Sequence, residues 1–503
     1  MIQRSMFTID SIGIMRCVYC MLILLLAVVA RAESVRHITL EEAVAIARTK
    51  SVDAAVALNE LRTAQWEYRT FRAGLLPEVT FKAKLPGYYK QYSSYQNSDG
   101  SYSFVPNNYM EINGELSLTQ SIWFTGGTLS LNTSLDYLRQ FGDNASQRFM
   151  SLPVALTLNQ PIFGVNAVKW NRRIEPVRYQ EAMATYMSAS ETVAMTAISY
   201  FFNLLIAGED VASSEQNLDN AERLYGVAQA KREMGQISRN DLLQMELNLL
   251  DARSALTDAR SAMSNRMFQL RSFLGIGDSV ALRPVAPRET PVADVTYGDV
   301  LDKALERNAF SRNVRRRQLE AEYEVVKARG EMREISLFAQ IGYTGMGARL
   351  NDAYGRLRDN QVVEVGVKIP LLDWGKRRGR VKVAESNREV VESRLRREEQ
   401  SFREDIFVLV ERFNNQRGQL DIAMRSDTIA ATRYDTNVKT YMVGKMSTLE
   451  LNDSRVKKDA ARREVITELY NYWYWYYQLR SLTLWDFARD IPLDAEDVIP
   501  PKM

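Results

Sequence analysis

Two stretches of the sequence keep apolar residues at heptad spacing over an unusual length, and this limits the possible folds more than any other feature. The first stretch runs from Tyr186 to Ala228 and predicts a helix over about residues 166–232. The second runs from Val381 to Tyr434 and predicts a helix over about residues 375–441. A helix of about 65 residues is roughly 100 Å long, at 1.5 Å per residue. Each helix must therefore lie against partners of similar length, as in a coiled coil.

Each long helix ends at a short turn and is followed by a return helix. The turns are Gly235-Gln236-Ile237-Ser238 and Gly444-Lys445-Met446-Ser447. In both turns the glycine ends the helical pattern and the serine is placed to cap the next helix. The return helices are predicted over residues 239–274 and 448–484. In the second of them, Glu450 and Asp453 are three positions apart and therefore lie on one face.

The whole arrangement occurs twice in the chain. Thr39 is placed to cap a helix that reaches about Ala73, and the segment that begins at Val295 matches the one that begins at Ile38, 257 positions earlier (295 − 38). The two turn glycines are only 209 positions apart (444 − 235). The difference of 48 residues (257 − 209) falls within a strand region, so the first repeat carries an extra strand or loop there. We divide the chain into a first repeat (33–280), a linker with several prolines (281–294), a second repeat (295–487) and a C-terminal tail (488–503).

Between the helices the period of the pattern becomes two, which predicts β-strands over about residues 78–160, 335–347 and 361–370. Tyr88 to Asn108 has the composition of a polar loop. Six strands are then expected, apolar on one face and polar on the other, as suits a membrane barrel. Six strands per chain are too few to close such a barrel, and open edges do not survive in lipid, so several copies must contribute.

Composition excludes several classes of function. Residues 1–32 have an apolar run followed by Ala30-Arg31-Ala32, which is typical of a secretory signal peptide; the alternative is an uncleaved anchor. Both cysteines, Cys17 and Cys20, lie inside this segment, so the mature chain offers no disulfide or thiol chemistry. His37 is the only histidine, which excludes the common hydrolytic triads and zinc sites. The mature net charge is (65 − 3) − (62 − 1) = +1, which does not suggest nucleic acid. We expect neither an enzyme nor a bound cofactor or metal.

Four motifs together resemble one known family. They are Leu40-Glu-Glu-Ala43, Gln160-Pro161-Ile-Phe163, Ile369-Pro-Leu-Leu-Asp373-Trp-Gly375 and the pair of helix turns. With them the chain resembles the TolC-like outer membrane efflux proteins over about residues 38–487. The resemblance implies a mainly α-helical chain with a membrane β-barrel part, built from two structural repeats. It implies a homotrimer with a β-barrel in the outer membrane lipid and an α-helical tunnel in the periplasm. It also implies two partners, a periplasmic adaptor protein and an inner-membrane pump.

The resemblance also implies roles for particular residues. Both turns, 235–238 and 444–447, match the periplasmic tip that contacts the adaptor. Glu450 and Asp453 match acidic positions that narrow the tunnel, where three copies would form a ring of carboxylates that favours cations and whose mutual repulsion raises some pKa values. Tyr441 and Asp241 match residues that latch the closed tip in some members. Because Met446 stands where the basic partner of that latch would be, a latch here needs another cation, with Lys445 and Arg239 as the alternatives.

Some alternatives stay open at this point. Glu450 and Asp453 could be ordinary solvated helix charges, and the turns could be simple connectors. The family usually contributes four strands per chain, so the extra pair here either widens the barrel or forms a separate hairpin near its rim. The aromatic run from Tyr470 to Tyr477 is expected to pack against the helices rather than form a membrane belt, for which Trp123 and Phe124 are better candidates. The predicted function is a passive exit for efflux or type I secretion; the alternative is a coiled-coil structural or adhesin protein without a pore.

Overall fold

The computed structural model describes residues 34–142, 145–277, 280–291, 294–332, 334–368, 372–443 and 445–493. The predicted signal peptide, Gly444, the Ile369-Pro370-Leu371 part of the third motif and the end of the tail lie outside these ranges. The chain divides into two compact units. Unit 1 comprises Met1–Glu60, Ala184–Asn308 and Arg403–Met503, and unit 2 comprises Leu61–Met183 and Ala309–Phe402. Each unit therefore combines segments of both sequence repeats.

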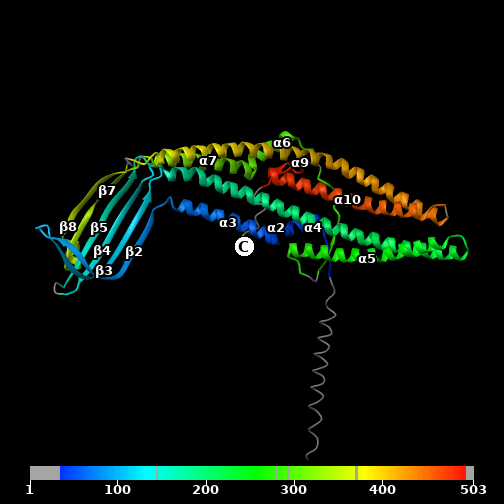
Figure 1. Cartoon of the computed structure of the whole chain (residues 1–503), viewed down its shortest axis with the longest axis horizontal. Helices are drawn as coiled ribbons and strands as arrows, with labels where there is room; N and C mark the ends of the chain where they lie inside the picture. The colour runs from blue at the N-terminus through cyan, green and yellow to red at the C-terminus, as the bar shows by residue number, and fades with distance from the viewer. Residues whose placement is uncertain are drawn as a thin grey trace, which may run out of the picture. The chain divides into compact units, whose positions relative to one another are not determined.

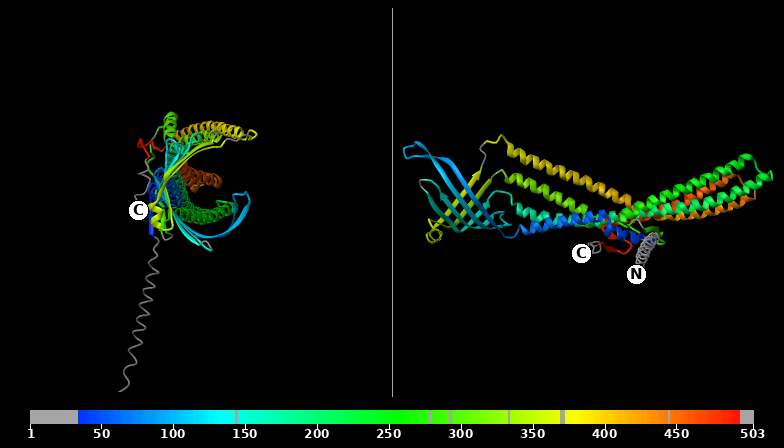
Figure 2. Two further views of the ribbon diagram at one scale, coloured as in Figure 1. Left: turned by 90° about the vertical axis from the view of Figure 1, so that its left-hand side faces the viewer. Right: turned by 90° about the horizontal axis from the view of Figure 1, so that it is seen from below.

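Unit 2 contains one six-stranded sheet in which every neighbouring pair is antiparallel (Figure 1). Its strands are β2 (Glu78–Gln96), β3 (Tyr102–Ser121), β4 (Thr128–Gln140), β5 (Ser146–Pro161), β7 (Glu334–Gly347) and β8 (Leu357–Lys368). The order across the sheet is β2-β3-β4-β5-β7-β8, so β2 and β8 are its two edges. Seen from its end, the sheet bends into an open arc (Figure 2, left).

The two faces of the sheet differ, as the alternating pattern predicts. One apolar row crosses five strands through the paired residues Val79, Leu118, Leu131, Leu156 and Ile341. These side chains are exposed in the single chain, Val79 by 65% and Ile341 by 58%. On the other face polar side chains bond across the strands: the Ser117 hydroxyl donates to Asn132 at 2.7 Å, and the Asn132 amide donates to Thr157 at 3.2 Å. An exposed apolar face of this extent needs a partner other than water.

The expectation of a polar loop from Tyr88 to Asn108 is wrong. The β2–β3 ladder continues to the pair Gln96↔Tyr102, and the hairpin reaches past the other strands (Figures 1 and 2). Tyr89 and Tyr109 face each other across this ladder, with ring centres 4.9 Å apart. Because both faces of the projecting ribbon are solvated, its sequence lacks the apolar alternation that marks a half-buried strand.

Four helices of unit 2 lie side by side in the order α3-α4-α7-α9. They are α3 (Val52–Ala73), α4 (Ala167–Glu233), α7 (Ala309–Gly330) and α9 (Lys376–Met442), of which α3, α4 and α9 continue into unit 1. The α3–α4 contact is a stack of Tyr68 on Tyr179, with ring centres 5.0 Å apart. Arg316 of α7 bonds Glu181 of α4 at 2.6 Å. Phe310 of α7 stacks on Phe402 of α9 at 4.4 Å.

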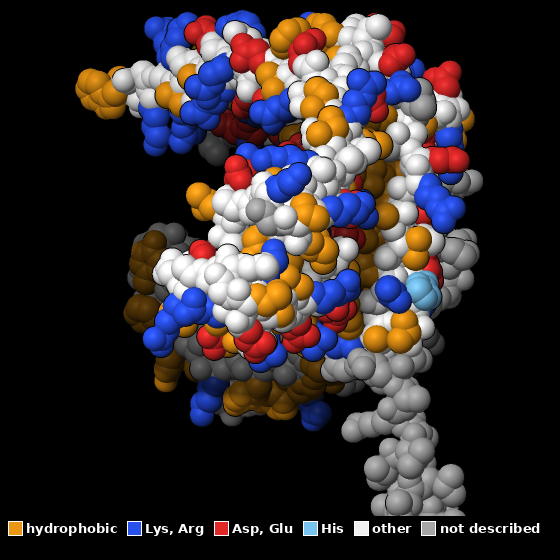
Figure 3. Space-filling model, turned by 90° about the vertical axis from the view of Figure 1, so that its right-hand side faces the viewer, with side chains coloured by type: hydrophobic (Ala, Val, Ile, Leu, Met, Phe, Trp, Pro, Cys, Tyr) orange, Lys and Arg blue, Asp and Glu red, His pale blue; other side chains and the backbone are white. Residues whose placement is uncertain are grey.

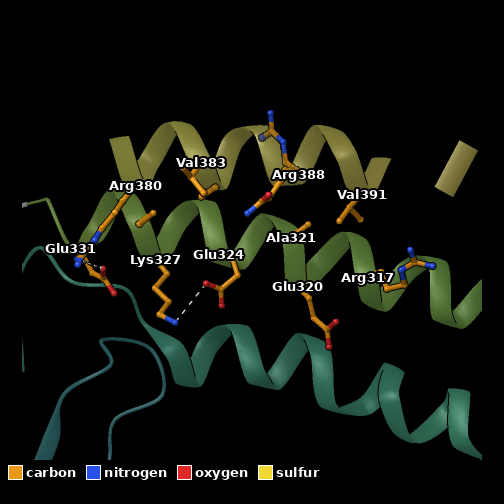
Figure 4. A pocket seen from close by; sticks show the side chains of 13 residues that line it. Arg317, Glu320, Ala321, Glu324, Lys327, Glu331, Arg380, Val383, Arg388 and Val391 are labelled. Atoms are coloured by element: carbon orange, nitrogen blue, oxygen red, sulfur yellow. Dashed lines mark ion pairs between the residues drawn. The ribbon is translucent and has the colours of Figure 1, made fainter. Parts of the chain in front are cut away.

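A groove of about 570 Å³ opens between α7 and α9 (Figure 4). Its floor is apolar, formed by Ala321, Val383 and Val391, and charged side chains line its rim. Lys327 pairs with Glu324 of its own helix at 3.6 Å. Arg380 reaches across from α9 to Glu331 at 4.0 Å. The charges along this helix pair are therefore largely matched within the chain.

Unit 1 is a bundle of helices with two small two-stranded sheets among its described residues. Besides parts of α3, α4 and α9 it contains α2 (Leu40–Lys50), α5 (Arg239–Leu274), α6 (Tyr297–Arg307) and α10 (Thr448–Thr483). Its core includes fully buried large side chains, among them Ile198, Phe201, Phe202, Leu270 and Phe413. Of the described helices, only α4 is long and apolar enough to cross a membrane, but a core helix passes the same test, and half of its most apolar window is buried.

Two segments expected to be irregular carry short strands instead. β6 (Val280–Pro284), at the start of the predicted linker, pairs in parallel with β1 (Ser34–Ile38). β10 (Ile491–Pro492), within the predicted tail, pairs with β9 (Trp485–Asp486). Such short pairings satisfy backbone groups through distant partners, and this leaves no periodic signal in either segment alone.

The helix expected from Thr39 to about Ala73 is broken at Ser51, which ends α2 in extended conformation with ψ 151°. Ser51 is buried, and its hydroxyl accepts from the Ala54 amide at 3.1 Å, so it caps the start of α3. Asn308, 257 positions later, breaks the second repeat in the same way, also at ψ 151°. The apolar pattern continues through both breaks, which is why it predicts one helix.

The aromatic run near the end of α10 packs inside unit 1, as expected. Tyr472, Trp473, Tyr476 and Tyr477 are all buried. Beside them is a buried ion cluster in which Glu191, 1% exposed, pairs with Arg48 and at 3.1 Å with Arg480. Arg480 also bonds Asp486 at 2.9 Å.

Replacement of Glu191 by Ala should destabilise unit 1 strongly. It removes the buried carboxylate that pairs with both Arg48 and Arg480, and breaking a buried pair costs about 3–5 kcal/mol. The readout is the midpoint of thermal loss of helical circular dichroism in the purified protein. Glu215→Ala is the matched control on the same helix, because Glu215 is 51% exposed and its pair with Arg260 should contribute little. Equal midpoints for the two variants would contradict the structural role of the cluster.

Candidate functional site

The first turn joins α4 to α5 and is fixed at both ends by backbone geometry. Gly235 has φ +73°, a left-handed conformation that glycine adopts without strain, and the Gln236 amide donates to the Lys231 carbonyl at 2.9 Å. Ser238 then caps α5. Its hydroxyl accepts from the Asp241 amide at 3.1 Å, and the Asp241 carboxylate accepts from the Ser238 amide at 3.1 Å. This reciprocal capping box satisfies the free amides of the first turn of α5.

The second turn joins α9 to α10 with the same construction. Gly444 lies outside the described residues, and beyond it the Lys445 amide donates to the Thr440 carbonyl at 3.2 Å. The Ser447 hydroxyl accepts from the Glu450 amide at 3.3 Å, and the Glu450 carboxylate accepts from the Ser447 amide at 3.2 Å. Glu450 is therefore first of all a capping residue.

A shared apolar core lies directly behind both turns. It consists of the buried residues Leu224, Ala228, Met245, Tyr434 and Leu451, with Ile237, Leu242, Val438 and Tyr441 packed against it. These residues come from α4, α5, α9 and α10, so the two helical hairpins are packed into one body at this level. Outside the core, large apolar side chains around the turns stay exposed: Met234 by 63%, Val443 by 69% and Leu449 by 78%.

Charges of both signs surround the exposed apolar side chains. Seen from the side of the two turns, Lys and Arg side chains are interspersed with Asp and Glu (Figure 3). The Asp241 and Glu450 carboxylates have lowered pKa values because the capping serines Ser238 and Ser447 hydrogen-bond to them. Both turns therefore keep their acidic groups charged at neutral pH.

Asp453 also has a lowered pKa, for a different reason. The Lys457 side chain hydrogen-bonds to it at 3.2 Å, and Arg433 of α9 donates to it at 3.1 Å. Within one chain each of the two carboxylates, Glu450 and Asp453, has its own hydrogen-bond donors; the expected repulsion between copies stays a prediction. The sequence could have indicated Lys457, which is one helical turn beyond Asp453, but Arg433 lies on the other helix of the hairpin and gives no local signal.

Tyr441 lies where α9 approaches α4. Burial raises its pKa, and the charge of Asp241 raises it further. A cation beside the Tyr441 ring is Lys231, which the sequence did not single out. Its Nζ lies 5.6 Å from the centre of the Tyr441 ring and donates to the Met442 carbonyl at 3.2 Å. This contact ties the end of α4 to the end of α9.

The described residues contain no group of three or more His, Cys, Asp or Glu side chains that could hold a metal ion. The carboxylates of Asp241 and Glu450 cap helices, and that of Asp453 forms ion pairs. Such an arrangement can order the turns, bind a partner's donors and set a local potential.

Comparison with known proteins gives one family and several structures. The family described as "Outer membrane efflux protein" matches residues 44–276 and 300–483. No curated protein matches the chain in sequence. The solved structures of similar fold include the Campylobacter jejuni CmeC outer membrane channel, with 16% identity and a TM-score of 0.63 over 88% of this chain and 85% of that one. The Vibrio cholerae outer membrane protein VceC has 13% identity and a TM-score of 0.60 over 90% of this chain and 97% of that one.

A third structure is similar to the same extent. It is the open state of the Neisseria gonorrhoeae MtrE outer membrane channel, with 14% identity and a TM-score of 0.58 over 90% of both chains. At such identities the likeness concerns the fold. It confirms the expected fold class of two helix–strand repeats.

Removal of the second cap should loosen the start of α10 locally. Ser447→Ala deletes the hydroxyl that accepts from the Glu450 amide, which costs about 1 kcal/mol and so about a fivefold increase in local opening. Hydrogen exchange followed by mass spectrometry on peptides covering residues 447–455 measures this opening. Ser401→Ala, an exposed change inside α9, is the control and should leave these peptides unchanged. Identical exchange in the two variants would show that the cap does not hold the turn.

Proposed function

Because the chain belongs to the outer membrane efflux protein family, we propose that three copies form a channel through which substrates pass out of the cell. The protein is located in the outer membrane, and its family consists of channels rather than enzymes. In the proposed assembly it provides a passive exit, an inner-membrane pump supplies the substrate, and a periplasmic adaptor joins the two.

The sheet of unit 2 carries this proposal. Its apolar face is exposed in the single chain, and among the described residues β2 and β8 each have a strand on one side only. In lipid an unpaired strand edge leaves backbone groups without partners, at several kcal/mol each. Copies of the chain that pair edge to edge remove both problems, because the apolar row then faces lipid around a closed wall.

The two turns support the partnership with an adaptor. Their capping boxes hold the backbone rigidly, so a partner loses little entropy on binding them. The exposed Met234, Val443 and Leu449 offer an apolar contact, surrounded by charged and polar groups. Such an apolar centre with a polar rim is the usual composition of a protein interface. We therefore assign the turns 235–238 and 444–447 as the adaptor-binding tip.

Glu450 and Asp453 are proposed to line the narrow part of the tunnel, where three copies would bring six carboxylates together. Their lowered pKa values keep them charged, and such a ring favours cations. Arg433 and Lys457 partly neutralise Asp453, so Glu450 contributes most of the uncompensated charge. Lys231, Tyr441 and Asp241 are the proposed latch that holds the two hairpins together.

In planar bilayers the purified protein should form channels that prefer cations. Changing Glu450 to Gln and Asp453 to Asn removes the proposed ring, so the reversal potential in a salt gradient should move toward zero by at least half. Asp219→Asn is the matched control, because Asp219 is an exposed carboxylate of α4 paired with Arg223. A protein without any conductance would favour the alternative, a coiled-coil scaffold, and an unchanged preference in the double variant would remove the ring assignment.

The cation preference should survive mild acid. A carboxylate with a lowered pKa keeps its charge above that pKa and loses it as the pH falls through it. At pH 4.5, the ordinary value for glutamate, Glu450 should therefore still be mostly charged. Reversal potentials measured from pH 7 down to pH 3 test this. Loss of the preference well above pH 4.5 would mean that repulsion within the ring outweighs the hydrogen bonds from Ser447.

A further inference from the structure

We propose that edge strand β2 of one copy pairs with edge strand β8 of the next, so that the closed barrel contains eighteen strands rather than the twelve expected of four-stranded chains. This inference rests on the proposed trimer and specifies its barrel. It resolves the two alternatives for the extra strand pair, a wider barrel or a separate hairpin, in favour of the wider barrel.

The β2–β3 hairpin lies at one edge of the sheet and is continuous with the rest of it. β3 pairs with β4 along the whole of β4, from Ser121↔Thr128 to Tyr109↔Gln140. Only the tip of the hairpin, from Tyr89 on β2 to Tyr109 on β3, projects past β4. Removal of the hairpin would leave four strands, β4, β5, β7 and β8, which is two from each repeat. In this sheet the first repeat therefore contributes two strands more than the second.

The apolar face extends to both edges. On β2, Val79 and Phe81 are 65% and 68% exposed. On β8, Val363 and Val365 are 75% and 61% exposed. The register places Val363 and Val365 opposite Ala339 and Leu337 of β7, on the same face as the apolar row. Edge strands with lipid-facing residues are suited to lie in the barrel wall rather than outside it.

The helices of unit 2 have the same order as the strands they join. α3, at one side of the helical layer, leads into β2, the edge strand on that side. α9, at the other side, follows β8, the opposite edge. One side of the chain therefore presents α3 and β2 together, and the other presents β8 and α9. If copies are related by rotation about the barrel axis, α3 and β2 of one copy lie beside α9 and β8 of the next.

The width of the sheet agrees with the width of the layer of four helices only if the two strands of the hairpin belong to the barrel wall. Four helices packed at about 8–10 Å span roughly 32–40 Å. Strands spaced about 4.8 Å apart and tilted by about 40° take about 6.3 Å of circumference each, so six span about 38 Å and four only about 25 Å. Three copies then close a barrel about 36 Å across between backbone centres, compared with about 24 Å for twelve strands. The barrel is as wide as the helical layer and adds no constriction of its own.

Cysteine cross-linking tests which strands meet between copies. Both native cysteines lie in the predicted signal peptide, so the mature chain gives a clean background. Double variants place one cysteine at Val79 or Phe81 of β2 and the other at Val363 or Val365 of β8. In outer membranes, oxidation should produce reducible dimers and trimers on denaturing gels. The matched controls place the first cysteine at Leu129 or Leu131 of β4 and should not cross-link.

Cross-links from β4 to β8 without any from β2 would overturn the proposal, because they would place the hairpin outside the wall. Electron cryomicroscopy of the wild-type protein in nanodiscs provides the second measurement, a count of strands in the barrel. Eighteen strands support the proposal, and twelve overturn it even if no variant cross-links. An eighteen-stranded trimer that fails to conduct would keep this inference and remove the proposed function, so the two can fail separately.

Discussion

The unpaired edges of the six-stranded sheet are the constraint on which the rest of the structure depends. A strand edge can be left open in water but not in lipid, where each free backbone group costs several kcal/mol. β2 and β8 each carry such an edge and each carry apolar residues on the exposed face. In lipid both edges therefore need a strand beside them, and the proposed pairing with identical copies would supply it.

The long helices face a similar constraint in water. α4 and α9 carry apolar residues along their length that must be buried, because most of a helix's stability in a protein comes from packing, and each folds back through a capped turn onto a return helix. The core formed by Leu224, Met245 and Leu451 with their neighbours joins the two hairpins. Farther along the bundle, the buried Glu191 is held by two arginines from different helices. Such a cluster adds specificity of register, because a shifted helix would leave a buried charge unpaired.

The sequence predicted those features that have a local periodic signal. The heptads, the strand alternation and the two Gly–x–x–Ser turns each repeat along the chain, so their element type and order follow from the residues. Features made by long-range contacts were missed: the β1–β6 pair, the breaks at Ser51 and Asn308, and the partners of the acidic residues. The Tyr- and Ser-rich tip of the β2–β3 hairpin, between Tyr89 and Tyr109, was predicted to be a loop. Neither of its faces is buried, so its sequence lacks the apolar alternation of a half-buried strand.

The roles of Lys231 and Arg433 show why a site is harder to predict than a fold. The family resemblance predicted that Tyr441 and Asp241 act together in a latch. It left Lys445 and Arg239, close to the turns, as the alternatives for the cation. In the structure Lys231, in the last turns of α4, contacts both the Tyr441 ring and the Met442 carbonyl. A cation at this place balances the free carbonyls at the end of α9 as well as approaching the ring. The same residue can thus stabilise a helix end and join two hairpins, a combination that depends on how the helices pack and that no single segment of sequence contains.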